Sequence, residues 1–336
     1  MLNVQQACSR EVRVKVLVAD KFEQAGLDGL AAAGCEVLNQ PGAGASGLAE
    51  AVAKADPHVL IVRSSKVTAE VLGRAPSLKL VIRAGAGVDN IDVGAASSRG
   101  VKVCNTPGMN AVAVAELAMG LLLCCDRRLP EQWDAARQGR WDKKEFGKAR
   151  GLKGLTLGVI GVGNIGQEVI RRAGAFGMHV VAWSRGITPQ HASALNCEWG
   201  GTDTPALMSL AARCDAISVH LPLTDTTKKL FGKAFFDAMK PGAYFINTSR
   251  AGVVDEAALR DAVRTKGLRA GLDVSENQPA EAQAPWGNES AKLAGVYLSH
   301  HCGASTDQAQ LAVAEEAVRV VRVFKQTGRA ENCVNA

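Results

Sequence analysis

The sequence predicts an α/β fold made of two doubly wound domains with parallel sheets. Short runs rich in Val, Ile and Leu recur at intervals of roughly 20 to 30 residues through much of the 336-residue chain. Between many of these runs lie Ala- and Leu-rich segments of helical length, an alternation typical of parallel sheets covered on both faces. One sheet with so many strands would be unusually wide, so two domains fit the length better.

Nine apolar runs are predicted to be strands: residues 14–19, 59–62, 80–83, 157–160, 179–183, 216–220, 243–247, 269–273 and 296–299. Segments 110–129 and 306–324 are predicted to be helices that connect the domains. In the second of these, apolar residues recur on one helical face. That face is predicted to consist of Leu311, Ala314, Val318, Val321 and Phe324.

Composition excludes several classes of protein. The longest apolar stretch, residues 117–125, is far shorter than the ~20 residues that cross a bilayer. Residues 1–13 contain no apolar signal-peptide core, so we expect a cytoplasmic protein. The net charge of +6 is spread among interleaved acids, which favours small anionic partners over nucleic acid. The nine cysteines include no Cys-x-x-Cys pair, so neither a disulfide framework nor a metal site is predicted.

A glycine motif follows the predicted strand 157–160. Gly161, Gly163 and Gly166 form G-x-G-x-x-G, with Asn164 and Ile165 inside the motif and a helical segment after it. The first glycine permits a tight turn, the second lets a pyrophosphate approach the backbone, and the third allows close packing of helix on strand. These five residues are therefore predicted to bind a dinucleotide at a helix N-terminus. The alternative is a Gly-rich turn without a ligand.

The next strand ends at Trp183, Ser184 and Arg185. An acidic residue usually follows this strand in NAD-binding domains and binds the ribose diol. Arg185 instead favours NADP over NAD, because a guanidinium pairs with a 2′-phosphate. In the alternative, Arg185 points to solvent and Ser184 alone contacts the ribose.

Polar residues follow three later strands, and Arg250, Gln278 and His301 are among them. The carboxyl ends of strands in a doubly wound sheet converge on the cofactor crevice, so we expect these three side chains to meet around one substrate. Oxidation of an alcohol beside a carboxylate needs a cation for the acid and a base for the hydroxyl proton. Arg250 and His301 suit these roles, although a buried Arg also serves as a structural ion-pair partner.

The sequence resembles the D-2-hydroxyacid dehydrogenase family, and most of all its D-3-phosphoglycerate dehydrogenase branch. The stretches that carry the resemblance are RAGAGVDNID at 83–92, NTP at 105–107, the glycine motif, NTSRAGVVDE at 247–256, GLDV at 271–274 and HCGAST at 301–306. The resemblance implies a discontinuous substrate domain, 1–106 with 302–336, and a dinucleotide-binding domain, 107–301. It also implies a homodimer held largely through the dinucleotide domains. Because the chain ends soon after Phe324, we expect no regulatory domain.

The resemblance also implies roles for single residues. Arg250 binds the substrate carboxylate and His301 is the acid/base, chosen over His300 by its spacing to Gly303. Asp273 bonds the nicotinamide carboxamide, although a role as a cap or turn residue is the alternative. The other residues implied to bind the cofactor are Leu221, Pro222, Thr248 and Gly303. Those implied to bind the substrate are Arg63, Ser64, Arg83, Gly85, Ala86, Gly87 and Asn110.

Gln278 departs from the family pattern, which has Glu before this Pro. A neutral amide orients the ring of His301 but does not stabilise its positive charge as a carboxylate does. We therefore predict that His301 titrates at lower pH than in relatives with Glu.

The predicted function is NAD(P)-dependent hydride transfer to or from a small D-2-hydroxy acid. The first candidate is 3-phosphoglycerate, whose phosphate Arg63 and Arg83 would hold, and the second is hydroxypyruvate or glyoxylate. Formate oxidation is a further alternative, because formate dehydrogenases also have Gln and Asn at the positions of Gln278 and Asn110. Against it, Ala86 is small where those enzymes have a larger apolar side chain. A dinucleotide-sensing corepressor is the alternative without catalysis.

Overall fold

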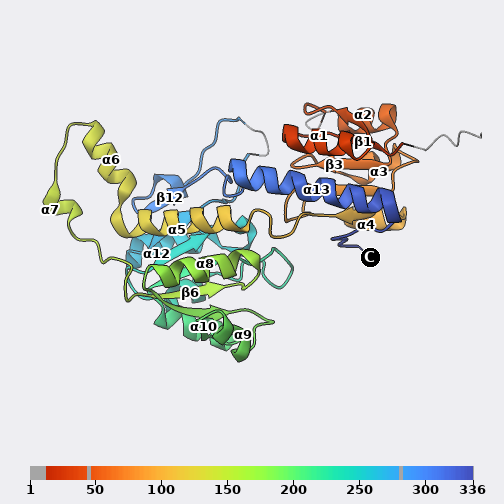
Figure 1. Cartoon of the computed structure of the whole chain (residues 1–336). Coiled ribbons are helices and arrows are strands. Elements are labelled where there is room, and N and C mark those ends of the chain that lie inside the picture. Colours follow the sequence, from red (N-terminus) through yellow and green to blue (C-terminus); the bar gives the residue numbers. More distant parts are fainter. Residues whose placement is uncertain (1–12, 44–46, 280–282, 336) are drawn as a thin grey trace, which may run out of the picture. The chain divides into compact units, whose positions relative to one another are not determined.

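The computed structural model describes residues 13–43, 47–279 and 283–335. The chain divides into two compact units, the first made of residues 1–109 and 310–336 and the second of residues 110–309. Each unit contains one parallel sheet with helices on both of its faces (Figure 1). The predicted α/β class with two doubly wound sheets is therefore confirmed, and the first unit is discontinuous in sequence.

The sheet of the first unit has the strand order β2-β1-β3-β4-β5. Its strands are β1 (Lys15–Val18), β2 (Glu36–Asn39), β3 (Val59–Val62), β4 (Leu80–Arg83) and β5 (Lys102–Cys104). Its helices are α1 (Gln24–Ala32), α2 (Leu48–Ala55), α3 (Ala69–Gly73), α4 (Val93–Ser98) and most of α13 (Asp307–Thr327).

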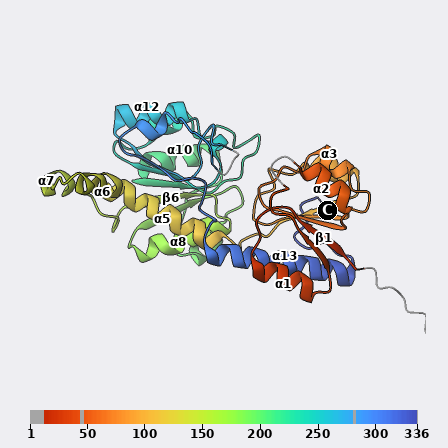
Figure 2. The same ribbon diagram turned by 90° about the horizontal axis from the view of Figure 1, so that it is seen from above.

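Alternate side chains of these strands enter two separate cores. Leu17 and Leu60 pack with α2, α3 and α4, whereas Val16 and Ile61 pack with α1 and α13. Figure 2 shows α1 and α13 side by side on this second face. Both faces of the sheet are thus apolar, as expected for a parallel sheet between two helical layers.

The sheet of the second unit has the strand order β12-β11-β10-β9-β6-β7-β8. Its strands are β6 (Thr156–Ile160), β7 (His179–Trp183), β8 (Glu198–Trp199), β9 (Ala216–Val219), β10 (Tyr244–Asn247), β11 (Arg269–Leu272) and β12 (Val296–Leu298). The direction of winding reverses between β6 and β9. Ligands of open α/β sheets bind outside the carboxyl ends of the strands at such a reversal.

Helices cover both faces of this second sheet. They are α5 (Ala111–Arg127), α6 (Leu129–Arg137), α7 (Lys143–Phe146), α8 (Asn164–Ala175), α9 (Pro189–Ala194), α10 (Thr204–Arg213), α11 (Lys233–Ala238) and α12 (Glu256–Lys266), with short 3₁₀ turns at Ala251–Val253 and Ser290–Lys292. Helices α5 and α8 pack on one face, and α10, α11 and α12 pack on the other. Figure 2 shows α10 and α12 on the opposite side from α5 and α8. Among the described residues, no helix combines the length and apolarity that crossing a bilayer requires.

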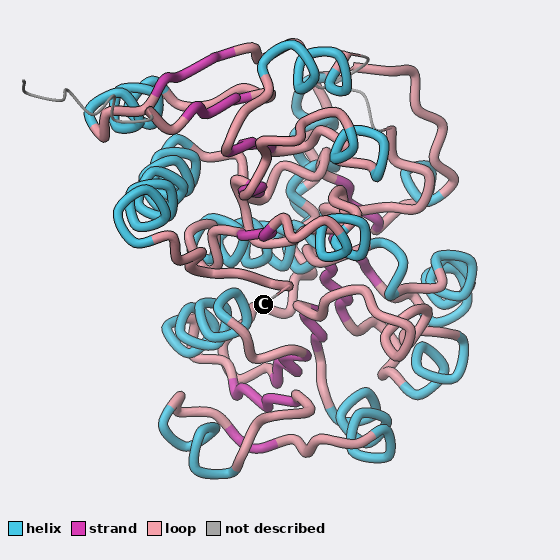
Figure 3. The backbone as a smooth tube through the Cα atoms, turned by 90° about the vertical axis from the view of Figure 1, so that its right-hand side faces the viewer, coloured by secondary structure: helices cyan, strands magenta, loops and turns pink. Residues whose placement is uncertain are grey.

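All nine predicted strands and both predicted helices are present, with ends that differ by a few residues. The prediction missed β2, β5 and β8, which are among the strands drawn in magenta in Figure 3. The prediction that Leu311 lies on the buried face of α13 is wrong, because Leu311 is 41% exposed. The core of the first sheet contacts this helix only from Val313 onward, so the first turn of the helix lies outside that core.

Candidate active site

The strands of the second sheet end in one row. Trp183, Ile160, Val219, Asn247 and Leu272 are register partners across five neighbouring strands, and Leu298 continues the row on β12. The residues that follow these positions are Ser184, Gly161, His220, Thr248, Asp273 and Ser299. Parallel register therefore places several predicted site residues along a single edge of the sheet.

The turn from β6 into α8 requires glycine at two positions. Gly161 has φ +97°, and a Cβ there would lie 2.6 Å from the carbonyl oxygen of His220. A Cβ on Gly166 would overlap the carbonyl oxygen of Gly161. These glycines let the backbone of the turn, the first turn of α8 and the loop after β9 approach one another closely.

Gly163 differs from the other two glycines, because a Cβ there would meet nothing within 4 Å. Gly163 precedes the 12-residue helix α8, and no side chain caps the N-terminus of this helix. The first N–H groups of a helix, here those of Asn164 and Ile165, lack partners within the helix. Open space before uncapped N–H groups fits the pyrophosphate of a dinucleotide.

The loop after β9 borders this turn. Leu221 Cδ2 lies 3.2 Å from the position of a Cβ on Gly161. His220 Nε2 is 2.9 Å from Ser218 Oγ, and His220 Nδ1 is 3.5 Å from Thr248 Oγ1. Burial lowers the pKa of His220 to about 3, so its ring is neutral at physiological pH. Leu221 and Thr248, both predicted to contact the cofactor, thus adjoin His220, the first in sequence and the second through its hydroxyl, while Pro222 follows in the same loop.

Ser184 and Arg185 follow β7, and the guanidinium of Arg185 is exposed. Its Nη2 lies 3.4 Å from the carbonyl oxygen of Thr226, in the loop after β9. The cation is therefore directed across the carboxyl edge of the sheet toward the neighbouring loop.

Arg250, Gln278 and His301 line one cavity of about 580 Å³. Leu223 and Ser275 contribute to the same wall. The three polar residues follow β10, β11 and β12 respectively. A cation, an amide and an imidazole thus face the same space within the second unit.

Hydrogen bonds define the orientation of the Gln278 amide. Its Oε1 accepts from the backbone N–H of Ser275 at 3.2 Å, and its Nε2 lies 2.7 Å from Nδ1 of His301. An amide nitrogen only donates. His301 Nδ1 is therefore the acceptor, and the neutral ring carries its proton on Nε2.

Asp273 holds the loop that bears His301. Its backbone carbonyl accepts from the N–H of His301 at 2.8 Å. Its carboxylate, 3% exposed, accepts from Ser299 Oγ at 2.7 Å and from the N–H groups of Cys302 and Gly303 at 2.9 Å each. These bonds support His301 in a left-handed conformation, with φ +52°, that residues other than glycine rarely adopt. A bond from Asp273 to nicotinamide stays a prediction.

Asn247 organises the segment that bears Arg250. Its Oδ1 accepts from the N–H of Ser249 at 3.0 Å and from Ser249 Oγ at 2.7 Å, while its Nδ2 donates to the carbonyl of Arg250 at 3.0 Å. Asn110, at the start of α5, is 9% exposed, and its buried Oδ1 has no hydrogen-bond partner among the described residues.

In the first unit, Asp20 organises the loop after β3. Its carboxylate accepts from the N–H groups of Arg63, Ser64 and Ser65 at 2.6, 2.9 and 3.0 Å and from Ser65 Oγ at 2.5 Å. Burial raises the pKa of Asp20, but these hydrogen bonds outweigh burial and leave the pKa below its ordinary value. The N–H of Ser64 therefore already has a partner inside the protein.

The loop after β4 packs on Arg83. Gly85 has φ +149°, and a Cβ there would overlap the guanidinium of Arg83. Arg83 Nε donates to the carbonyl of Arg63 at 3.1 Å, and the N–H of Gly85 donates to the carbonyl of Arg83 at 2.8 Å. Within residues 85–87, the N–H groups of Ala86 and Gly87 donate to no other residue that the structure describes.

Sequence reasoning missed Asp20, Glu256 and the part played by Ser275. An acid directly after an apolar strand was the available signal for Asp20, because strand ends border the site. Glu256 lies within the stretch NTSRAGVVDE that carries the resemblance, but nothing in the sequence indicated that it is buried.

The second unit has the strand order, glycine turn and polar carboxyl edge of a dinucleotide-binding α/β domain. Residues 119–303 match the family model described as the NAD binding domain of D-isomer specific 2-hydroxyacid dehydrogenases. The chain belongs to the D-isomer-specific 2-hydroxyacid dehydrogenase family, which confirms the predicted resemblance.

Individual relatives extend the comparison. The chain is 39% identical over 324 residues to D-3-phosphoglycerate dehydrogenase from Methanocaldococcus jannaschii, covering 96% of this chain and 59% of that protein. It is 42% identical over 272 residues to hydroxypyruvate reductase from Thermotoga maritima, covering 80% and 85%. The chain thus spans little more than half the length of the phosphoglycerate dehydrogenases that it matches.

Among solved structures, the fold is similar to that of NADPH-dependent glyoxylate/hydroxypyruvate reductase from Sinorhizobium meliloti in complex with NADP and malonate. The TM-score is 0.79 at 30% identity, covering 96% of this chain and 97% of that one.

Proposed function

We propose that this chain is an NAD(P)-dependent oxidoreductase that acts on a small D-2-hydroxy acid or the corresponding 2-oxoacid. The observation that carries the proposal is the cavity lined by Arg250, Gln278 and His301. It opens at the carboxyl edge of the sheet that bears the glycine turn. In this proposal residues 107–301 bind the dinucleotide, and residues 1–106 with 302–336 form the substrate domain.

Each polar residue of the cavity has a distinct role in the proposal. The bound nicotinamide gives or accepts the hydride. Arg250 pairs with the substrate carboxylate and polarises the adjacent carbonyl. Protonated His301 donates from Nε2 to the carbonyl oxygen during reduction. During oxidation Nε2 takes the hydroxyl proton, which requires the neutral ring to carry its own proton on Nδ1 and the Gln278 amide to turn its oxygen toward that nitrogen. Gln278 orients the ring, and Asp273 holds its loop.

For the substrate we propose 3-phosphoglycerate first and hydroxypyruvate or glyoxylate second. The N–H groups of Ala86 and Gly87 bind the carboxylate, with contributions from the side chains of Ser64 and Asn110. Gly85, whose N–H donates to the carbonyl of Arg83, shapes the loop that presents these groups. Arg63 and Arg83 hold the phosphate. The names of the relatives from Methanocaldococcus jannaschii and Thermotoga maritima support the first and second choices respectively. Gln278 is the observation that favours formate as a third candidate.

For the cofactor we propose NADP rather than NAD. The exposed guanidinium of Arg185, directed toward the loop after β9, is suited to a 2′-phosphate. Arg185→Ala is expected to weaken NADPH binding by about ten-fold or more and to leave NADH binding nearly unchanged. Fluorescence titration with both nucleotides measures the ratio, and equal losses for the two would contradict the preference.

A reduction screen tests the proposed function directly. The purified chain is assayed with 3-phosphohydroxypyruvate, hydroxypyruvate and glyoxylate, each with NADH and NADPH, and formate oxidation is assayed in parallel. Arg250→Ala and His301→Asn are expected to abolish turnover while nucleotide binding persists. Nucleotide binding by the wild type without turnover of any substrate would favour a dinucleotide-sensing role instead.

A further inference from the structure

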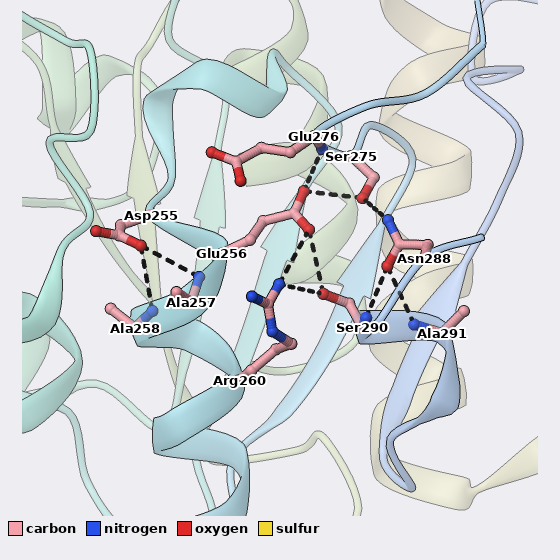
Figure 4. Close-up of polar contacts among 10 residues, drawn as sticks. All are labelled: Asp255, Glu256, Ala257, Ala258, Arg260, Ser275, Glu276, Asn288, Ser290 and Ala291. Carbon is pink, nitrogen blue, oxygen red and sulfur yellow. Dashed lines mark hydrogen bonds and ion pairs between the residues drawn. The ribbon is translucent and has the colours of Figure 1, made fainter. Parts of the chain in front are cut away.

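Glu256 is a carboxylate buried beside the loop that bears Gln278. It is the first residue of α12 and is 2% exposed. Its Oε1 accepts from Ser275 Oγ at 2.8 Å and from the backbone N–H of Glu276 (Figure 4). Its Oε2 accepts from Ser290 Oγ at 3.1 Å and lies 3.9 Å from Arg260 Nη1.

These contacts join two segments that are distant in sequence from the helix. Ser275 and Glu276 follow β11, whereas Ser290 lies in the turn that precedes β12. Asn288 Nδ2 donates to Ser275 Oγ at 2.5 Å, which ties the two segments to each other (Figure 4). Both ends of the connection between β11 and β12 are thereby fixed to the start of α12.

Ser275 links Glu256 to Gln278, which lines the cavity. Its hydroxyl is held by Glu256, while its backbone N–H donates to Gln278 Oε1 at 3.2 Å and its carbonyl accepts from the N–H of Gln278 at 3.3 Å. The orientation of the Gln278 amide thus depends on where Ser275 lies. That amide in turn donates to Nδ1 of His301 at 2.7 Å.

Capping of α12 does not account for the buried charge. The neighbouring Asp255 performs that task, because its Oδ1 accepts from the N–H groups of Ala257 and Ala258 at 3.1 and 3.2 Å (Figure 4). A buried carboxylate is costly to desolvate, and an apolar side chain of similar volume often gives equal or greater stability. What an apolar side chain would not supply is the acceptor that holds Ser275 and Glu276.

We propose that Glu256 is a positioning residue that acts through Ser275 and Gln278 to hold the ring of His301 in place within the cavity. The proposal rests on the proposed function, in which Nε2 of His301 faces the reacting oxygen. It assigns Glu256 to the effectiveness of proton transfer and not to nucleotide binding.

Kinetics of three variants test this role, with Asp255→Ala as the matched control at the start of the same helix. Glu256→Ala is expected to lower kcat for 2-oxoacid reduction on the order of 10- to 100-fold, because small misplacements of a catalytic group are costly. The dissociation constant of the nucleotide is expected to stay unchanged. Glu256→Gln is expected to recover much of kcat, since its amide oxygen still accepts from Ser275 and Glu276. Asp255→Ala is expected to lower Tm without a comparable loss of kcat, and an equal loss would overturn the proposal.

A double-mutant cycle separates positioning from general destabilisation. Once Gln278→Ala has removed the link to His301, adding Glu256→Ala is expected to cause no further fall in kcat. Independent, multiplicative losses would overturn the proposal. If Glu256→Ala does not fold, Ser275→Ala takes its place in the cycle with the same expectation.

A spectroscopic readout keeps the proposal testable if the wild type reduces no 2-oxoacid, an outcome that would refute the proposed function alone. Imidazole ¹⁵N NMR of the nucleotide-free protein reports which ring nitrogen carries the proton, and loss of signals in His301→Asn assigns them. The wild type is expected to show His301 protonated on Nε2. Glu256→Ala is expected to change these signals and Asp255→Ala to leave them unchanged. His301 signals that Glu256→Ala leaves unaltered would overturn the positioning role.

Discussion

Gln278 has a fixed orientation, and this matters for the charge of His301. Its amide oxygen is occupied by the N–H of Ser275, so its nitrogen faces Nδ1 of the ring. Protonation of Nδ1 would set two donors against each other. The protonated ring that reduction requires therefore needs the amide to turn, which sacrifices the bond to Ser275. A carboxylate at this position would instead accept from the protonated ring.

Gln278→Glu is accordingly expected to extend reduction activity to higher pH. The alkaline limb of the kcat/KM profile should move upward by about 1 to 2 pH units, because an adjacent carboxylate stabilises the imidazolium. The control is Asn277→Asp, which adds the same charge one residue away without replacing the amide. Superimposable profiles for the wild type and Gln278→Glu would show that position 278 does not govern this proton.

The low pKa of His220 has a consequence for stability. Burial holds the pKa at about 3 in the folded chain, against about 6.5 in an unfolded one. Above pH 6.5 the ring of His220 is neutral in both the folded and the unfolded state, so the free energy of unfolding has its full value with respect to this group. As the pH falls below 6.5, His220 binds a proton in the unfolded state but not in the folded state. The free energy of unfolding therefore declines toward pH 3.

The variant His220→Asn is expected to lose this contribution to the pH dependence. Urea unfolding between pH 7 and 4 should show a smaller decline in the free energy of unfolding for the variant than for the wild type. Parallel curves would mean that the ring of His220 is protonated in the folded state as readily as in the unfolded one.

At the scale of elements, the glycines in the turn from β6 into α8 have two different roles. Gly161 and Gly166 are needed for folding, whereas Gly163 leaves space for a ligand. Gly166→Ala would drive a methyl group into the carbonyl of Gly161, and we expect it to lower the free energy of unfolding by roughly 3 kcal/mol. Gly163→Ala meets open space and should fold normally. Its methyl group would occupy the region proposed for the pyrophosphate, so nucleotide affinity should fall.

Thermal unfolding and nucleotide titration of the two variants give the comparison. Gly163→Ala should keep its Tm and lose affinity, whereas Gly166→Ala should lose Tm. If Gly163→Ala bound the nucleotide as tightly as the wild type, the phosphates would have to lie elsewhere.

The sequence predicted the central strands because both of their faces are buried. Runs such as 59–62 and 80–82 are continuously apolar, and strands enclosed by two helical layers have to be so. The missed strands β2, β5 and β8 all lie at sheet edges. Two of them also contain polar residues, Glu36 in β2 and Glu198 in β8. Short edge strands bury less surface and leave a weaker apolar signal.

The site was predictable to the extent that strand order determines it. Arg250, Gln278 and His301 each follow a strand, and parallel register brings such positions to one edge. Glu256 and Asp20 were not predictable, because their partners are hydrogen-bond donors far away in the sequence. Pairings of that kind depend on packed backbone positions that no local pattern encodes.

At the scale of the whole molecule, we propose a homodimer formed through the second unit. Trp133 on α6 is 56% exposed, and Trp141, just before α7, is 89% exposed. Large aromatic side chains are enriched at protein interfaces. Their exposure in the dinucleotide unit supports the dimer that the family resemblance implies.

The double variant Trp133→Glu with Trp141→Glu is expected to be a monomer. Sedimentation velocity at micromolar concentration should show the wild type as a dimer and the variant at half that mass. The control is Trp199→Glu, which removes another exposed tryptophan, 44% exposed on β8. A dimeric double variant would place the interface on a different surface.

The interleaving of the two units also governs the order in which they are completed on the ribosome. The helix segment with Ala317, Val318 and Val321 that covers one face of the first sheet is synthesised only after all of residues 110–309. At 5 to 20 residues per second, that delay lasts roughly 10 to 40 seconds. During this interval the nascent strands β1 to β5 present an apolar face, including Val16 and Ile61, that α1 covers without α13. Newborn chains are therefore most vulnerable to aggregation, and most in need of a chaperone, while their second unit is being synthesised.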